Sequence, residues 1–553
     1  MVFWIVIILG VLVLFVIAGI VQSRKRQRKS LDTIREQWGK PKNSRRNFQA
    51  ISSYLDLTAT EQTTSSADLD KDDIFNFIDR TNSKPGQQLL YKLLYSENST
   101  ANNFIPLEQT ISKLNQNDDL RERTELKLTS LNNDDAYYLP TLFSKDQTSI
   151  FSAPVNFYIK IGLPLLLALI ISFSIVHSQI YFVLILFCLI TNVILHLVNR
   201  NRMVRYTYTL PQILLLSKVG TWLYNEGLVQ NEENFNRGLI SVSRLKKSLG
   251  FISLQNKINN DPTDISYLIA EWLKMFLLIE PLNFIYSINI INKRRDDIHT
   301  VFLGIAEVDL AVSVLSLRKG LPYYSLPHFS SDGTIVVKNL YHPLVEDCVP
   351  NSIEINSAQG ILITGSNMSG KTTFIKALAI NSLLAQTINT SLSTCYQAPR
   401  LNIFTSININ DDLGGHTSYY QAEAISVGNI IQNCRESSFQ KSLVIIDELF
   451  RGTNTIERIA AAKAVISYFV KNGIFVIVST HDLELTELLG NDSKVFSFEE
   501  VIEGDQSRFD YKMKDGLLKN KNGIAVLQRL DYPPDIIQEA SRVSLELRKL
   551  YKL

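Results

Sequence analysis

Three short segments in the C-terminal half of the chain carry residue types that bind and cleave phosphoanhydrides. The first is a glycine-bounded loop made of Gly365, Ser366, Asn367, Met368, Ser369, Gly370, Lys371, Thr372 and Thr373. It follows an apolar run typical of a strand and precedes a run typical of a helix, the context that a phosphate-binding loop requires. Backbone N–H groups and the helix N-terminus would face the anion, Lys371 would reach the β- and γ-phosphates, and Thr372 would bind Mg²⁺. The alternative is a chance glycine-rich turn, but the acidic segment described next favours a site for ATP with Mg²⁺.

The other two segments end in groups that could assist hydrolysis. Residues 443–448 are four apolar residues followed by Asp447 and Glu448, a pattern typical of a buried parallel strand whose carboxyl end meets a nucleotide. Asp447 would hold Mg²⁺, and Glu448 would orient or deprotonate the attacking water. A further apolar run, residues 474–480, ends at His481. A lone histidine is more often structural, but at this strand end it would contact the γ-phosphate. Glu448, His481 and Lys371 are therefore the predicted catalytic residues.

These segments resemble the ATPase motifs of the MutS family, the DNA mismatch-repair ATPases. The resemblance lies in residues 365–373, 447–454 and 479–486, with similar stretches at 339–344, 73–90 and 502–537. It is good over 335–545, patchy over 66–330 and absent at the N-terminus. Residues 411–423 look like the family's signature loop, which implies a homodimer in which Ser418 reaches the γ-phosphate bound by the other subunit. The family's neighbouring arginine falls on Thr417 here, which weakens the expected contact between subunits.

Composition sets broad limits on the protein. The chain has 553 residues, is 45% hydrophobic and carries a net charge of +2. Its length suffices for two or three domains with cores of their own, and its balanced charge gives no overall signal for a polyanionic partner. The four cysteines are too scattered for a metal cluster or a disulfide framework and suit a reducing compartment: Cys188, Cys348, Cys395 and Cys434.

The N-terminus predicts a membrane helix. Residues 2–21 carry no charge, and twenty helical residues span a hydrocarbon core of about 30 Å. A signal peptide is the alternative, but no basic region precedes the apolar run, and basic residues at 24–29 follow it. The positive-inside rule places that basic side in the cytoplasm, where it would also meet anionic lipid head groups.

Two further apolar runs predict a membrane hairpin. Residues 155–177 and 179–198 are separated by a very short turn, and basic residues follow the second run. A helical hairpin buried in a soluble core is the alternative. A fourth apolar stretch, residues 265–291, contains Glu271, Lys274 and Glu280, which are costly near a bilayer centre. A single further crossing would also place the ATPase outside the cell, so this stretch is interpreted as a core helix.

The predicted fold class is mixed. It combines three transmembrane helices, an all-α core or lever region, and a C-terminal α/β P-loop domain of the ABC-like ATPase type. The expected order is a transmembrane helix (1–21), a basic and polar tether (22–65), a helical core-like segment (66–154), the membrane hairpin (155–198), a helical core or lever region (199–330) and the ATPase domain with a C-terminal helix (331–553). We expect the protein in the inner or plasma membrane, in contact with lipid and with its ATPase on the cytoplasmic side.

The chain departs from the mismatch-repair pattern that the resemblance implies. Residues 1–65 leave no room for the family's mismatch-reading and connector domains. Residues 498–500 spell the family's mismatch-reading Phe-x-Glu motif, but they lie inside the expected ATPase domain, so the match is a coincidence. Scattered basic residues could contact DNA phosphates, although such residues are more often simply solvated: Arg244, Lys246, Lys247, Lys293, Arg294 and Arg295.

Two functions of different classes follow. The first is a membrane-anchored MutS-like ATPase that binds double-stranded DNA and senses damage or unusual structure. ATP binding would close the dimer, and hydrolysis through Glu448 would reopen it. The second is a membrane-associated ATPase switch or scaffold that acts on protein partners without DNA. An ABC-type transporter is a weaker third interpretation, because residues 447–454 look like MutS and six spans per dimer make a small pore. No small-molecule substrate other than ATP is expected.

Overall fold

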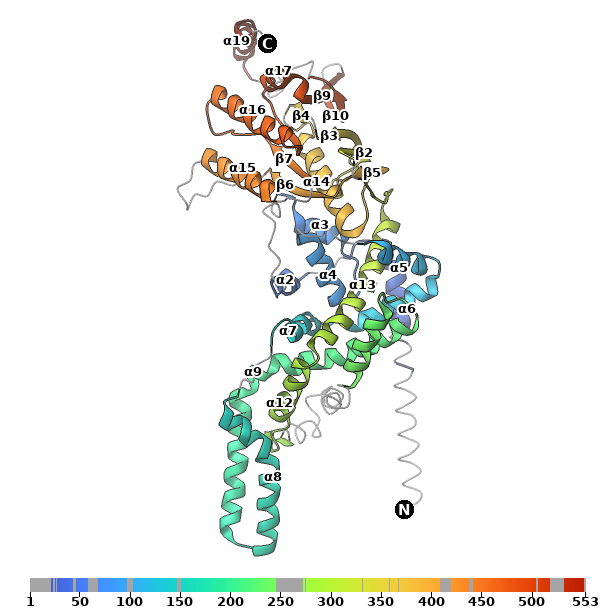
Figure 1. Ribbon diagram of the computed structural model, residues 1–553, viewed down its shortest axis with the longest axis vertical. Coiled ribbons are helices and arrows are strands. Elements are labelled where there is room, and N and C mark those ends of the chain that lie inside the picture. Colours follow the sequence, from blue (N-terminus) through green and yellow to red (C-terminus); the bar gives the residue numbers. More distant parts are fainter. Residues whose placement is uncertain are drawn as a thin grey trace. The chain divides into compact units, whose positions relative to one another are not determined.

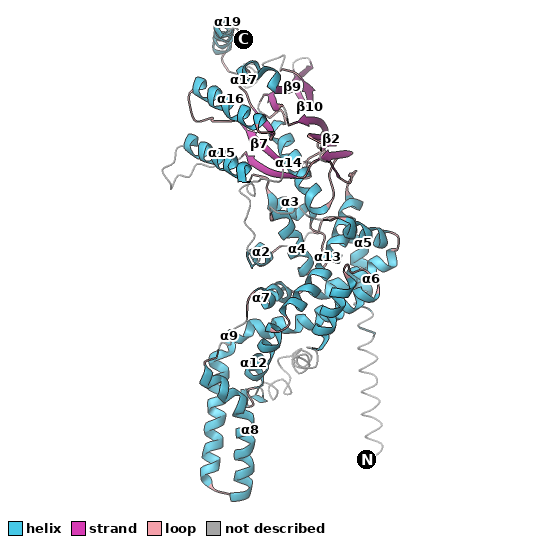
Figure 2. Cartoon of the chain, in the orientation of Figure 1, coloured by secondary structure: helices cyan, strands magenta, loops and turns pink. Residues whose placement is uncertain are grey.

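Figure 1 shows the computed structural model of the chain, and Figure 2 shows the same view coloured by secondary structure. The structure describes residues 21–22, 25, 27–42, 46–57, 68–96, 103–146, 151–244, 272–273, 275–330, 332–357, 359–366, 368–407, 419–436, 441–503, 506–517 and 532–551. The expected first membrane helix, residues 1–21, lies outside the described residues apart from its last one.

The chain divides into two compact units of different class. The helical unit comprises residues 1–60, 78–93 and 103–320, and the sheet unit comprises residues 61–77, 94–102 and 321–553. The first contains long helices in its described part, and the second contains parallel strands alternating with helices (Figure 2). The predicted mixed class is therefore confirmed. The boundary differs from the expected one, because residues 61–77 belong to the sheet unit.

The helical unit is organised around one buried helix. The helices of this unit include α2 (Phe48–Leu57), α4 (Lys84–Tyr95, of which residues 84–93 belong here), α5 (Ile105–Asn115), α6 (Asp118–Leu128), α7 (Leu139–Ser144), α8 (Ala153–Val176), α9 (Gln179–Asn225), α12 (Ile279–Asn292) and α13 (Arg295–Gly320). Helix α13 is buried along most of its length and packs against α5, α6, α7 and α9. Helix α4 has an apolar face, on which Leu89 and Leu90 are buried.

A buried carboxylate ties α13 to the start of α4. Both oxygens of Asp309 accept hydrogen bonds, from the Asn82 and Ser83 backbone N–H groups and from the Ser83 hydroxyl, at 2.6–3.1 Å. Burial raises the pKa of Asp309 to about 6, although these hydrogen bonds oppose the rise. A Cβ on Gly86 would lie 2.3 Å from the Asp309 carboxylate, so only glycine allows this approach.

Part of the expected tether is instead an ordered piece of the helical unit. Helix α2 buries Ile51, Tyr54 and Leu55, and the preceding Arg46 forms a buried ion pair with Asp79, with Nε and Oδ2 2.8 Å apart. The assignment of residues 22–65 as a tether is therefore wrong for residues 46–57. The polar residues around positions 48–57 made the segment resemble a tether. The segment is a short amphipathic helix whose apolar face packs against residues far along the chain.

Helices α8 and α9 form a long antiparallel hairpin (Figure 1). Helix α9 continues unbroken from the hairpin into the rest of the helical unit, with 47 residues in all. Among the described residues, three helices are long and apolar enough to cross a membrane: Ala153–Val176, Gln179–Asn199 and Arg295–Gly320. The first two are 17% buried and the third is 83% buried. The third is thus the core helix α13, whereas the hairpin exposes most of its apolar surface.

The sheet unit contains two sheets in its described part. The larger has the order β10-β9-β4-β8-β7-β6, and of these described strands only β10 is antiparallel to its neighbour. Its strands are β4 (Gly360–Gly365), β6 (Leu401–Ser406), β7 (Lys441–Asp447), β8 (Phe475–Ser479), β9 (Ser493–Glu503) and β10 (Gln506–Asp515). The smaller, of order β1-β5-β2-β3, contains β1 (His328–Phe329), β2 (Thr334–Leu340), β3 (Asn351–Asn356) and β5 (Cys395–Ala398).

Helices cover the two faces of the larger sheet. The helices of this unit are α3 (Lys71–Ile78, up to residue 77), α14 (Lys371–Ile388), α15 (Tyr419–Glu436), α16 (Thr455–Lys471), α17 (Glu484–Leu489) and α19 (Pro534–Tyr551). Helices α15 and α16 share a hydrophobic core with Val444, Ile446 and Val478 on one face. Alternate strand residues point to the other face, and α14 contacts β4, β6, β7 and β8. The central strands are buried on both sides, as continuous apolar runs predict.

A segment from the first hundred residues completes the sheet unit. Asp68, which is buried, accepts hydrogen bonds from the Thr405 hydroxyl at 2.9 Å and from the Ile407 backbone N–H at 3.0 Å. Lys376 on α14 forms an ion pair with Asp70 at 2.8 Å. These contacts explain why residues 68–77 join the sheet unit rather than the helical core-like segment in which the sequence pattern placed them.

Candidate functional site

The three segments with predicted chemistry end beside one another on the sheet. Strand β8 lies between β4 and β7, and its last residue, Ser479, pairs with Ile363 of β4 and with Asp447 of β7. Because the three strands are parallel, their carboxyl ends share one edge of the sheet. The glycine-rich loop, the two carboxylates and His481 follow directly from those ends.

The loop after β4 has the backbone of a tight turn leading into a helix. Gly365 and Gly370 have φ values of 152° and 103°, which favour glycine, and α14 begins at Lys371. A Cβ on Gly365 would lie 2.8 Å from the Phe498 carbonyl oxygen. Lys371 is 6% exposed, and its Nζ donates to the Gly365 and Ser366 carbonyl oxygens, each at 2.9 Å. Burial lowers the pKa of Lys371, and the Asp447 carboxylate opposes that change.

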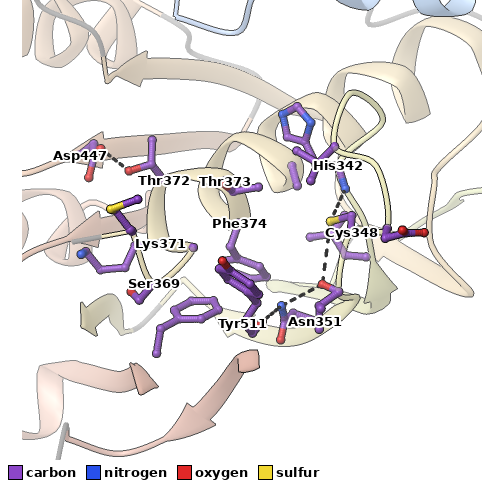
Figure 3. A pocket seen from close by; sticks show the side chains of 18 of the residues that line it. His342, Cys348, Asn351, Ser369, Lys371, Thr372, Thr373, Phe374, Asp447 and Tyr511 are labelled. Carbon is purple, nitrogen blue, oxygen red and sulfur yellow. Dashed lines mark hydrogen bonds between the residues drawn. The ribbon is translucent and has the colours of Figure 1, made fainter. Parts of the chain in front are cut away.

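Thr372 and Asp447 place two oxygen ligands together. The Thr372 hydroxyl donates to Asp447 Oδ2 at 2.7 Å (Figure 3). Within the described residues no three His, Cys, Asp or Glu side chains gather to hold a metal. A hydroxyl beside one carboxylate still fits Mg²⁺, which is commonly held by one or two protein oxygens together with phosphate oxygens and water. Two buried loop hydroxyls, Ser366 Oγ and Ser369 Oγ, find no hydrogen-bond partner in the part of the chain that the structure describes, and they add polar atoms for an anion.

Glu448 is held in an unusual conformation by its neighbours. Its φ is 60°, in the left-handed region that non-glycine residues rarely adopt, and its N–H donates to the Ser479 carbonyl oxygen at 2.9 Å. Glu448 Oε1 lies 3.1 Å from His481 Nε2, and Oε2 lies 2.9 Å from Arg451 Nε. The hydrogen bond with His481 is the largest cause that lowers the pKa of Glu448; Arg451 acts in the same direction and burial opposes both. Strain of this kind collects at functional sites, and here it aims an ionised carboxylate at the loop.

A pocket of about 610 Å³ joins the end beside the glycine-rich loop to a second, more apolar end. That second end is lined by residues which sequence reasoning did not select for the site: His342, Cys348, Asn351, Phe374, Phe498 and Tyr511 (Figure 3). The Asn351 side chain connects the two sheets, since its amide donates to the Tyr511 carbonyl oxygen at 2.9 Å and its oxygen accepts from the Met513 N–H at 2.8 Å. Burial lowers the pKa of His342 to about 4, so its imidazole is neutral near pH 7.

Signals for some of these residues were present in the sequence. His342 and Tyr511 lie in segments that resemble the MutS family, but nothing local marks their side chains as pocket residues. Arg451 was also missed, although it lies in the segment that follows the acidic pair. Its Nη2 donates to the Asp447 carbonyl oxygen at 3.1 Å, so the arginine contacts both acidic residues.

The expected contact between subunits falls on residues that the structure does not describe. Asn367, Thr417 and Ser418 all lie outside the described residues. The helix that follows the signature loop, α15, begins at Tyr419 and rests on the turn after the acidic pair. The rings of Tyr420 and Phe450 are 5.9 Å apart, and a Cβ on Gly452 would lie 2.8 Å from the Tyr420 backbone nitrogen. Only glycine at 452 allows that approach.

The structure also bears on the residues considered for DNA contact. Phe498 is 1% exposed within β9, so residues 498–500 cannot insert a ring into a duplex, and the motif there is a coincidence as expected. Arg294 hydrogen-bonds Ser241, and Arg295 forms an ion pair with Asp146 at 2.6 Å. Lys246 and Lys247 lie outside the described residues. The two arginines are therefore engaged within the helical unit.

Comparisons with known proteins agree with this geometry. Residues 361–548 match the sequence family described as MutS domain V. The DNA mismatch repair protein MutS of Aquifex pyrophilus is 34% identical over 254 residues, which are 44% of this chain and 29% of that protein. MutS protein homolog 4 of Homo sapiens is 28% identical over 329 residues, 56% of this chain and 33% of that protein. DNA mismatch repair protein MSH3 of Saccharomyces cerevisiae is 30% identical over 300 residues, 50% of this chain and 29% of that protein.

The matched part spans about a third of the length of these curated relatives. Residues 361–548 contain the loop after β4, the acidic pair and His481, whereas the similar stretches at 73–90 and 339–344 lie outside them. The predicted resemblance to the MutS family is thereby confirmed: residues 361–548 match MutS domain V.

Proposed function

We propose that this protein is a membrane-anchored, MutS-related ATPase that works as a homodimer and binds double-stranded DNA. The ATPase part of the proposal rests on one observation: strands β4, β8 and β7 end beside one another at the same edge of the sheet. They bring Lys371, the Thr372–Asp447 pair and the Glu448–His481 pair to one pocket. This combination of an anion-binding loop, an oxygen pair for a cation and an ionised base is what phosphoanhydride hydrolysis needs.

Each of these residues has a step in the proposed reaction. The loop N–H groups and Lys371 would bind the phosphates of ATP, and Thr372 and Asp447 would hold Mg²⁺. The metal would supply neutralisation of the charge on the phosphate oxygens. Glu448 would orient the attacking water and accept its proton, because its carboxylate stays ionised and is fixed in direction by His481 and Arg451. Tyr511 and Phe374 would offer aromatic surface to the adenine base of ATP at the other end of the pocket.

The DNA part of the proposal rests on the relatives. Two of them are described as DNA mismatch repair proteins, and the expected resemblance to the family extends, in patches, over residues 66–330. The alternative is an ATPase switch that acts on protein partners at the membrane. It is favoured by the engaged state of Arg294 and Arg295.

A DNA-stimulated ATPase assay separates these two functions. Detergent-purified full-length protein would be assayed at one stated salt concentration without DNA, with homoduplex, with mismatched duplex and with branched DNA. Phosphate contacts respond steeply to salt, so the salt must be fixed. We expect at least one DNA to raise the hydrolysis rate, and Lys371→Ala to abolish both the basal and the stimulated rate. A basal rate that no DNA changes would favour the protein-directed switch.

The membrane part of the proposal rests on the hairpin of α8 and α9. Both apolar helices are long enough to span a bilayer, and most of their side chains are left uncovered by the described part of the protein. Large apolar side chains such as Ile171, Ile175 and Phe187 are 58–75% exposed, which a soluble protein rarely shows over so long a surface.

The hairpin predicts a definite topology. His177 lies in the turn between the helices and is exposed. In a variant without native cysteines, His177→Cys should react with a membrane-impermeant maleimide added outside intact cells. The matched variant Ile456→Cys, at an 82% exposed position of the sheet unit, should react only after permeabilisation. Reaction of both variants to the same extent in intact cells would contradict the proposed topology.

A further inference from the structure

We propose that residues 272–292 dip into the membrane beside the hairpin and return to the same side, so that a fourth segment contacts lipid without crossing the bilayer. This inference rests on the proposal above that α8 and α9 span the membrane. It replaces the interpretation of residues 265–291 as a helix of the soluble core. Its described part consists of the helical residues 272–273 and 275–276, a turn at 277–278, and helix α12.

Helix α12 packs on the hairpin. It shares a hydrophobic cluster with the first part of α8, formed by Phe151, Ile159, Leu278, Phe284, Ile285 and Ile288. The turn lies beside Gly162 of α8, because a Cβ on Gly162 would lie 3.5 Å from Leu278 Cδ1. Gly162 is nine residues beyond the start of α8, a distance of about 14 Å along that helix. It follows the exposed Lys160 by two residues, so the turn contacts the apolar part of the hairpin near the end opposite its tip.

Broken backbone is tolerated inside a bilayer only where protein satisfies its polar groups. Here Asn192 of α9 does so, since its amide donates to the Phe276 carbonyl oxygen at 2.6 Å. Its side-chain oxygen accepts from the Tyr158 hydroxyl at 2.8 Å. Asn192 is 1% exposed. Both its amide and its side-chain oxygen are hydrogen-bonded, and the partner of the amide, Phe276, lies outside the two helices of the hairpin.

One of the three charges that spoke against membrane insertion, Glu280, is paired, and the other two, Glu271 and Lys274, lie outside the described residues. Glu280 lies near the turn, and its Oε2 is 3.7 Å from Nε2 of His196 on α9. His196 is 2% exposed, so the pair faces the interior between α9 and α12 rather than lipid. Ionisable side chains inside membranes take this arrangement. The topological objection is removed as well, because a segment that enters and returns leaves α13 and the ATPase on the cytoplasmic side.

The outer surface of the segment is suited to lipid. Trp272, Leu273 and Tyr286 are 49–56% exposed, and they belong to a segment that contacts α8 and α9, whose own apolar side chains are exposed. Tryptophan and tyrosine are the side chains that membrane–water interfaces favour. The exposed surface of this segment therefore continues the apolar surface of the hairpin, and the occupant that fits it is the acyl region of the bilayer.

Cysteine accessibility in lipid vesicles tests this inference. Single cysteines would be placed at Leu273 and Tyr286 in the full-length chain without native cysteines, reconstituted in phosphatidylcholine vesicles with the sheet unit outside. We expect loss of labelling by a water-soluble maleimide at both positions. Leu167→Cys, on the exposed face of α8, is the control for lipid contact, and Ile456→Cys is the control for water. As a second readout, Trp272 fluorescence in a Trp4→Phe background should be quenched by acyl-brominated lipid, and Trp272→Phe should lose that part of the quenching.

The outcomes separate this inference from the proposal beneath it. Protection of Leu167→Cys, Leu273→Cys and Tyr286→Cys, with bromine quenching of Trp272, supports the inserted segment. The inserted segment is overturned if Leu167→Cys is protected but position 273 or 286 is labelled as fast as position 456. It is also overturned if Trp272 is not quenched. Either result leaves the hairpin in the membrane. Labelling of Leu167→Cys itself would remove the membrane hairpin and this inference with it.

Discussion

The Glu448→Gln variant is expected to bind ATP and to hydrolyse it on the order of 10²- to 10⁴-fold more slowly, the usual contribution of a general base. Glutamine keeps the size of the side chain and can still accept a hydrogen bond, but it cannot take a proton from water. Glu448 suits the base role because its carboxylate is held by His481 at 3.1 Å and by Arg451 at 2.9 Å, and because these contacts keep its pKa low. In the proposed site the nucleotide is held by the loop of residues 365–373 and not by Glu448, so ATP should accumulate on the variant.

Single-turnover hydrolysis of radiolabelled ATP, with binding measured in parallel, checks this prediction. The matched control is Glu487→Gln, an exposed glutamate on α17 outside the pocket, which should hydrolyse ATP at the wild-type rate. If Glu448→Gln hydrolysed ATP as fast as this control, Glu448 would not be the base. Loss of both ATP binding and hydrolysis would instead show that Glu448 maintains the structure of the turn after β7, where its φ of 60° is unusual.

The parts of the site that could be predicted from the sequence share one property. Each lies within a few residues of the end of a continuous apolar strand, as Lys371, Asp447 and His481 do. Parallel strands bring such ends to one edge whatever their order, so local pattern was enough to predict that these residues meet. The order β4-β8-β7 and the pairing of Ser479 with both neighbours then supply the actual contacts.

The parts that escaped prediction depend on interactions between distant segments. Asn351 enters the pocket because β3 meets the backbone at Tyr511 and Met513, and no local pattern carries that information. The same holds for Asp68, whose partners are Thr405 and Ile407. Periodicity reports that a helix has an apolar face but not what covers the face. This is why α2 was mistaken for a tether.

The apolar helices show the same limit in a sharper form. Helix α13 and the hairpin helices satisfy the same test of length and composition, yet 83% of the first is buried and only 17% of each of the others. Composition alone cannot separate a central core helix from a membrane helix, because both exclude water along their whole length. The distinction required the structure, in which other described helices surround α13 but leave the outer part of the hairpin uncovered.

A second large effect is expected at Lys371, in the loop proposed to bind the phosphates of ATP. Lys371→Ala should abolish tight ATP binding, with hydrolysis lost in consequence. The Lys371 ammonium donates to the Gly365 and Ser366 carbonyl oxygens, so it is held inside the loop where phosphates would enter. Hydrogen bonds to charged groups contribute about 1.5–3 kcal/mol each, so removing one such bond to a phosphate should weaken binding by about 10- to 100-fold. Burial disfavours the charged form of Lys371. A phosphate bound beside the ammonium would compensate that charge, so we expect phosphate to bind the lysine more strongly than water does.

Equilibrium binding of a fluorescent ATP analogue measures this loss, and Lys463→Ala, at an exposed position of α16, is the matched control that should bind normally. The same lysine also braces the loop through its two carbonyl partners, so thermal unfolding without nucleotide must be measured beside binding. An unchanged unfolding temperature with lost affinity would assign the effect to the phosphates. Retained affinity would show that the loop N–H groups and the start of α14 suffice to hold the anion, and the role of Lys371 would then be confined to bracing the turn between Gly365 and Gly370.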